Sequence, residues 1–329
     1  MEKLDKDIET GRDALSPLAV GTICGILAAV GYTVTNACLK QVAEQNLNAF
    51  WVSAVKAFPT VLICAPWAYY QSRIGIRVMP NPKVFWLLIA SAFVGQIGGN
   101  AGFQFGLQYV GIAISVAICL GTIQIFGAIL GRIFLLEPVT IRAVGAIALL
   151  IGALGALSMG AKIDTKAHSA WEIALGIASL CISGFSYAVI GVAIRYGVTG
   201  RTTIAFTLSI IGSIGILSLG TIAATQIGWS GIASTTMQQW GVMLFAGLFN
   251  ALSFLALTKA YQATTVTYVA IMNACQTAMA ALVGAMFFKE KWTVSLSIGL
   301  ILTALGVTLM ALKRGKKRGQ APEELIHEP

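Results

Sequence analysis

The amino-acid sequence predicts an all-α polytopic membrane protein with ten transmembrane helices, arranged as two inverted five-helix repeats. The first observation is composition: of 329 residues, 57% are hydrophobic and only 11% are charged, and the mean hydropathy is +0.81. A soluble domain carries about 25% charged residues. The second observation is that the apolar residues form long blocks separated by short charged segments, as in helical membrane proteins. The third is a repeated stretch of sequence.

Ten apolar blocks have the length of about 20 residues that crosses a bilayer as a helix. Several have Trp or Tyr near their ends, which is typical of residues at the membrane interface. The expected spans are 17–39, 48–70, 84–107, 112–135, 140–161, 170–194, 202–225, 240–258, 266–288 and 292–312. The expected organisation is a cytoplasmic tail (1–16), a first repeat (17–161), a second repeat (162–312) and a basic cytoplasmic tail (313–329).

The positions of the basic residues predict the orientation of the chain. With the N-terminus inside, sixteen of the 22 Lys and Arg residues fall in inner segments and five in outer ones, and Lys56 lies within a span. Basic residues gather on the cytoplasmic side of membrane proteins. The bias favours ten helices with both termini in the cytoplasm, in the inner or plasma membrane of the cell.

Two stretches of the chain align with each other. "GAILGRIFLLEPVTIRAVGAIALLIGALGAL" and "AALVGAMFFKEKWTVSLSIGLILTALGVTLM" each contain an apolar helix, a Glu (Glu137 or Glu290), a turn, and a helix with two glycines seven residues apart. The two glutamates, beside turns, are interpreted as caps. An odd number of helices per repeat requires the second copy to be inverted across the membrane. Inverted repeats are typical of secondary transporters, which bind substrate near the midplane between the halves.

The Glu-turn-helix with paired glycines, present twice in a ten-helix chain, resembles the EamA-type branch of the drug/metabolite transporter superfamily. The resemblance covers about residues 17–312, and "GYTVTNACLK" and "ISGFSYAVIGVAIR" are similar to the starts of its two repeats. The sequence departs from the family where Lys56 stands in place of the usual Arg, and where Gln124 lies near the position of a frequent proline. The resemblance implies export of small metabolites, amino acids or related compounds, by alternating access.

Polar residues on the expected third helix form one candidate surface for substrate. Gln96, Asn100 and Gln104 are four residues apart, so they stack on one helical face. Gly98, Gly102 and Gly106 are also four apart, on the opposite face, and such a stripe lets a neighbouring helix approach closely. The amides are expected to face a cavity; the alternative is that they bond to neighbouring helices.

Other polar residues within the spans complete the candidate substrate-binding set, because polar groups inside a bundle are expensive and often functional. They are Tyr32, Asn36, Tyr187, Asn250, Asn273 and Gln276. No catalytic residue, metal ligand or cofactor is expected: no Asp or Glu lies deep in a span, both histidines fall outside the spans, the cysteines lack metal-ligand spacing, and no phosphate-binding loop is present.

The position of Lys56 within a span has two interpretations. The residue is either a cationic anchor for a carboxylate or phosphate on the substrate, or a structural residue that bonds carbonyls freed by Pro59 or extends toward the interface.

The net charge of +9 is scattered, so nucleic acid is not an expected partner. The expected partners are a small molecule and the lipid bilayer, and a homodimer is left open. An exchanger of anionic metabolites and a non-transporting scaffold or sensor are the alternatives; the lack of buried acids and histidines disfavours a membrane enzyme.

Overall fold

The structure, a computed structural model, describes residues 16–160, 169–287 and 293–311. Within these ranges the chain is helical and forms no strand. The elements are α2 (Pro17–Ala43), α3 (Ala49–Arg73), α4 (Pro82–Phe93), η1 (Val94–Ala101), α5 (Gly102–Val110), α6 (Ile112–Phe134), α7 (Ile141–Gly160), α8 (Ala170–Val198), α9 (Ile204–Ala233), α10 (Met237–Ala263), α11 (Val266–Asn273), α12 (Cys275–Phe287) and α13 (Val294–Ala311).

All ten predicted spans correspond to helical segments. In the described part of the chain, nine segments are long and apolar enough to cross a membrane, and α7 contributes a shorter apolar stretch, Ile141–Ala156. Several helices extend beyond the predicted ends, because polar caps that hydropathy does not detect set their limits. The eighth span, predicted at 240–258, begins at Met237, where the Thr236 hydroxyl and the Gln239 side chain form a capping box.

Two predicted spans are not single α-helices, which corrects the sequence prediction. The third span contains a π-helical segment, η1, between α4 and α5. The ninth is divided at Ala274 into α11 and α12. Hydrophobic length does not report such irregularities, because it depends on composition and not on which backbone carbonyl each N–H group bonds.

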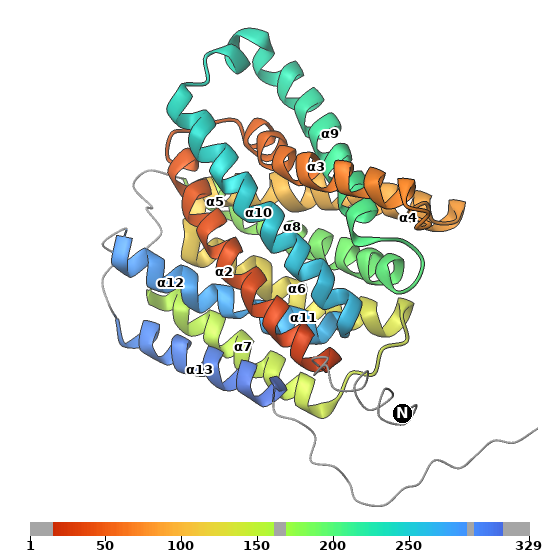
Figure 1. The fold of residues 1–329 in the computed structure, drawn as a ribbon. Helices are drawn as coiled ribbons and strands as arrows, with labels where there is room; N and C mark the ends of the chain where they lie inside the picture. Colours follow the sequence, from red (N-terminus) through yellow and green to blue (C-terminus); the bar gives the residue numbers. More distant parts are fainter. Residues whose placement is uncertain (1–15, 161–168, 288–292, 312–329) are drawn as a thin grey trace, which may run out of the picture.

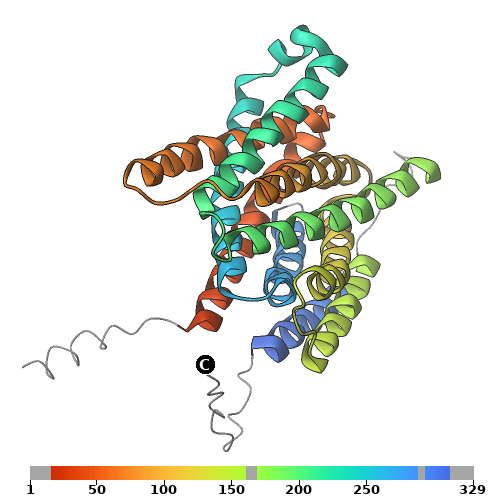
Figure 2. The ribbon, with the colours of Figure 1, turned by 90° about the vertical axis from the view of Figure 1, so that its right-hand side faces the viewer.

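The two repeats interlock instead of forming separate lobes. In Figure 1, α2 lies beside α10 and α7 beside α13, and the extensive contacts of α3 with α9 and of α6 with α8 also join the repeats. The turned view in Figure 2 agrees: α3, α4 and α9 lie at one end, α7 and α13 at the other. The centre of the bundle is therefore lined by helices from both repeats.

As the sequence predicted, the glycine stripe of the third span packs closely against a neighbouring helix, which the structure identifies as α8. A Cβ atom at Gly98 would lie 2.3 Å from the Ser186 Oγ atom, and one at Gly106 would lie 2.4 Å from the Leu180 Cγ atom. At Gly102 the nearest atom would be a backbone oxygen of α8, at 3.2 Å. These contacts hold the opposite face of η1 and α5 toward the interior of the bundle.

We expect Gly106→Ala to lower the free energy of unfolding by about 1–3 kcal/mol, the usual cost of overfilling a packed contact. The added methyl group would meet Leu180, which is fully buried, and a backbone oxygen of Gly176 at 2.9 Å, so neither neighbour can move freely. The measurement is denaturant unfolding of detergent-solubilised protein. Gly241→Ala is the control, because nothing lies within 4 Å of a Cβ at Gly241. Equal stability of the two variants would contradict the close α5–α8 contact.

Candidate substrate cavity

A cavity of about 130 Å³ lies between the repeats, with room for on the order of ten water molecules. Its lining comes from α2, α3, η1, α5, α6, α8, α9, α10, α11 and α12. Nine of the ten residues predicted to bind substrate are among its lining residues: Tyr32, Asn36, Lys56, Gln96, Asn100, Tyr187, Asn250, Asn273 and Gln276. Residues scattered over more than 240 positions of sequence thus meet around one space.

Lys56 lies at the centre of a hydrogen-bonded network in this cavity. The side chain is 5% exposed, and its Nζ atom donates to the Asn100 Oδ1 atom at 2.6 Å. The Tyr187 hydroxyl donates to the same oxygen at 2.8 Å. Among the described residues that line the cavity, Lys56 is the one charged side chain. The cavity therefore holds a buried cation whose described hydrogen-bond partner is a neutral amide.

The network continues along the π-helical segment to the second repeat. The Asn100 Nδ2 atom donates to the Gln96 Oε1 atom at 2.7 Å, and the Gln96 Nε2 atom donates to the backbone oxygen of Ile211 at 3.0 Å. Short π segments inside α-helices occur frequently at functional sites. Here η1 carries both amides and links α3 with α8 and α9 through side-chain bonds.

Gln104, the remaining predicted residue, lies outside the cavity lining. Its side chain is buried, and the Nε2 atom donates to the backbone oxygen of Leu39 at 3.5 Å. Its position on the same helical face was predicted, but its side chain contacts α2, and at this level the neighbouring Phe103 lines the cavity instead.

The break between α11 and α12 brings two further amides to the cavity. Asn273 ends α11 and Gln276 lies in the first turn of α12, and both line the cavity. The Asn273 Nδ2 atom donates to the Gln276 Oε1 atom at 3.5 Å, whereas the Asn273 Oδ1 atom is buried and has no hydrogen-bond partner among the described residues. Interrupted helices near the midplane are a recurrent feature of transporter binding sites.

Sequence reasoning missed three polar lining residues, Thr35, Thr60 and Tyr261. Thr60 follows Lys56 by four residues, so helical spacing could have placed it on the same face. Its buried Oγ1 atom has no partner among the described residues. Tyr261 gave no such signal, because its place in the lining depends on the close approach of α8: a Cβ at Gly191 would lie 2.8 Å from the Tyr261 hydroxyl oxygen.

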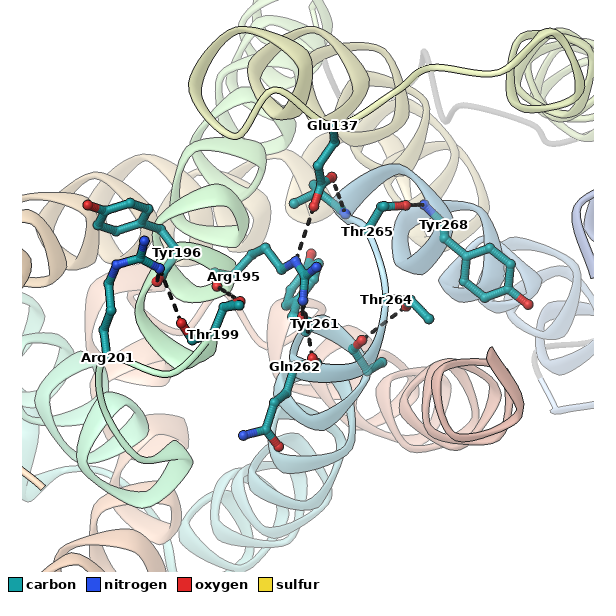
Figure 3. Close-up of polar contacts among 12 residues, drawn as sticks. Glu137, Arg195, Tyr196, Thr199, Arg201, Tyr261, Gln262, Thr264, Thr265 and Tyr268 are labelled. Atoms are coloured by element: carbon teal, nitrogen blue, oxygen red, sulfur yellow. Dashed lines mark hydrogen bonds and ion pairs between the residues drawn. The ribbon is translucent and has the colours of Figure 1, made fainter. Parts of the chain in front are cut away.

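An ion pair fastens the turn between α10 and α11, just beyond Tyr261 (Figure 3). The Arg195 Nε atom lies 3.1 Å from the Glu137 Oε1 atom, and Arg195 also donates to the backbone oxygens of Tyr261 and Gln262. The Glu137 Oε2 atom accepts the backbone N–H of Val266 at 2.8 Å. Helix ends leave carbonyls and N–H groups unpaired. This pair therefore satisfies the end of α10 and the start of α11 together.

The predicted capping role of Glu137 is thus confirmed, with one difference: the helix that it caps belongs to the other repeat. The residue before it, Leu136, has a φ of 54°, a left-handed conformation that is unusual for a non-glycine residue and reverses the chain there. Its counterpart in the second repeat, Glu290, lies outside the described residues.

Comparison with known proteins gives the family. The model of the EamA-like transporter family matches residues 19–159 and again residues 174–312. A curated relative, the pseudopaline exporter CntI of Pseudomonas aeruginosa (strain UCBPP-PA14), is 22% identical over 307 residues, which is 92% of this chain and 99% of that protein.

A solved crystal structure of a protein has the same fold, with a TM-score of 0.67 and 14% sequence identity over 88% of this chain and 95% of that one. At this identity the likeness concerns the fold alone. The double match of the family model covers most of the chain and coincides with the interlocked helices around the cavity. The chain therefore belongs to the EamA-like transporter family, and is a multi-pass membrane protein of two EamA repeats.

Proposed function

We propose that this chain is a secondary-active transporter that exports small metabolites, amino acids or related compounds, by alternating access. It would lie in the inner or plasma membrane with both termini in the cytoplasm. The observation that carries the proposal is the cavity between the repeats, which contains one buried cation and several amides. Such a space is where inverted-repeat transporters bind their substrates. Export is favoured because the curated relative is an exporter.

Exchange of anionic metabolites, such as organic acids or sugar phosphates, is the second candidate. It is supported by Lys56, since the described lining supplies no carboxylate to balance its charge. A carrier that reorients without substrate would move the unbalanced charge of Lys56. An exchanger would reorient with a second anion bound beside Lys56. The two candidates share the cavity and differ in whether flux requires a counter-substrate.

The experiment is efflux from proteoliposomes loaded with a mixture of amino acids, organic acids and sugar phosphates, followed by mass spectrometry of the external buffer. We expect selective, saturable loss of one class relative to protein-free liposomes. Flux into substrate-free buffer supports the exporter, and flux only when an external anion is added supports the exchanger. If no compound moves in either arrangement, the transport proposal fails and a scaffold or sensor becomes the better reading. Crosslinking in the same liposomes tests whether the chain forms a homodimer.

A further inference from the structure

We infer that the substrate binds through a carboxylate that takes the place of the Asn100 amide oxygen, so that Asn100 is a specificity-determining residue. This rests on the proposed function and adds the chemical group that the cavity recognises. The starting point is geometric. Two donors, the Lys56 ammonium and the Tyr187 hydroxyl, converge on one oxygen at 2.6 Å and 2.8 Å.

An ammonium and a hydroxyl that converge on one oxygen form a site suited to an anion. Hydrogen bonds between an ammonium and a carboxylate are roughly twice as strong as those between neutral groups. The amide oxygen of Asn100 carries only a partial charge, so it is a weaker acceptor for this donor pair than a carboxylate oxygen. A substrate carboxylate could displace it and gain the charge-assisted bonds.

The other repeat provides evidence that the fold itself does not require a cation in this helix. The two matches of the family model begin within α2 and within α8, so the helices that follow them, α3 and α9, are counterparts. α9 contains no Lys or Arg, and its Ile211, which lines the same cavity, is 1% exposed. The counterpart helix thus packs against the cavity without a cation. Because a buried charge is expensive in a membrane, Lys56 is better explained by a ligand than by packing.

Displacement of the Asn100 oxygen would also change the hydrogen bonds that join the two repeats. The Asn100 oxygen joins Lys56 of the first repeat to Tyr187 of the second, and its amide nitrogen supports Gln96, which is bonded to α9. A carboxylate in its place would keep Lys56 and Tyr187 together but release Asn100. Substrate would then alter the bonds between the repeats, which is what a ligand must do to shift a conformational equilibrium.

Two substitutions at Asn100 have opposite expected effects. Asn100→Asp has nearly the same shape but supplies a resident carboxylate to Lys56, so we expect at least a tenfold weaker binding of carboxylate ligands. Asn100→Ala removes the competing oxygen and leaves both donors free, so we expect carboxylates to bind at least as tightly as to the wild type. A purely structural role would predict that the alanine variant is the more damaged of the two.

The measurement is ligand-induced thermal stabilisation of the purified full chain. The probes are the amino acids and organic acids of the efflux mixture, each paired with its carboxamide. We expect carboxylates but not their amides to stabilise the wild type. Gln238→Glu is the charge control, because it adds one negative charge at an exposed position outside the cavity lining, in the first turn of α10, where a negative charge suits the helix N-terminus.

Three results would overturn the inference: no carboxylate stabilises the wild type, amides stabilise it as well as acids, or Asn100→Asp retains wild-type binding of carboxylates. If Asn100→Ala is too unstable to assay, Tyr187→Phe replaces it. We expect this variant to bind carboxylates up to about tenfold more weakly, because it lacks one neutral donor. Unchanged affinity of Tyr187→Phe would also contradict the inference. Efflux of neutral or cationic compounds without carboxylate binding would refute this inference alone. The absence of any efflux would refute the proposed function.

Discussion

Lys56→Gln is expected to weaken binding of carboxylate substrates roughly 10- to 100-fold while leaving the protein folded. The magnitude follows from a charge-assisted hydrogen bond of about 1.5–3 kcal/mol, with tenfold in affinity for each 1.4 kcal/mol. The folding result follows because glutamine keeps a hydrogen-bond donor on the same face of α3, and because removing a buried charge removes its desolvation cost. Efflux and thermal unfolding of the same preparation measure both effects.

The matched control is Lys259→Gln. Lys259 is exposed, and its Nζ atom donates to the Gln262 Oε1 atom within its own helix. We expect this variant to keep wild-type affinity, which separates the effect of the buried cation from a general loss of positive charge. If Lys56→Gln transports normally, or unfolds at a much lower temperature than the wild type, then Lys56 is a structural residue. The substrate site would then have to be sought at the amides of η1 and of the α11–α12 break.

The second large effect is expected at Glu137. We expect Glu137→Gln to lower the free energy of unfolding by about 3–5 kcal/mol, the usual cost of removing one partner of a buried ion pair. The side chains of Arg195 and Glu137 are 19% and 10% exposed, so the arginine left behind would stay largely shielded from water. The substitution also weakens the acceptor for the Val266 N–H. Denaturant unfolding in detergent measures the loss.

Exchanging the two charges distinguishes pairing from capping. In the double variant Glu137→Arg with Arg195→Glu the ion pair could re-form, but an arginine cannot accept the Val266 N–H and a glutamate cannot donate to the carbonyls of Tyr261 and Gln262. We therefore expect no recovery of stability. If the double variant regained the stability of the wild type, the ion pair alone would account for the contribution of Glu137, and the capping bonds would not. Arg201→Gln is the control, because Arg201 is exposed and bonds to carbonyls at the C-terminal end of α8, at Tyr196 and Thr199 (Figure 3).

Features that depend on the local sequence were predicted best. The positions of the spans follow from hydrophobic length, and the packing of Gly98, Gly102 and Gly106 against a neighbouring helix follows from their spacing. The convergence of Lys56, Asn100 and Tyr187 could be suspected, because polar residues within spans avoid lipid and face the interior. None of these inferences required knowledge of which helix lies beside which.

Features that depend on a distant partner could not be predicted. Nothing in the sequence around Gln96 and Asn100 indicates a π segment, and the bonds that its side chains make to α3, α8 and α9 depend on the packing of those helices. Gln104 has the same spacing as its two neighbours, yet it contacts α2 instead of the cavity. Glu137 is next to a turn in sequence, but the helix end that it caps lies 129 residues further along the chain.

The sequence by itself determined that this chain spans a membrane as ten apolar segments in two repeats, because hydrophobic length, basic residues and an internal repeat are properties of the chain. Only the tertiary structure decided that Lys56 and Tyr187 share one amide oxygen, that α11 and α12 separate at Ala274, and that Arg195 and Glu137 fasten the α10–α11 turn. Inside a bilayer a polar group without a partner is costly. Which partner it finds depends on how the two inverted repeats interlock.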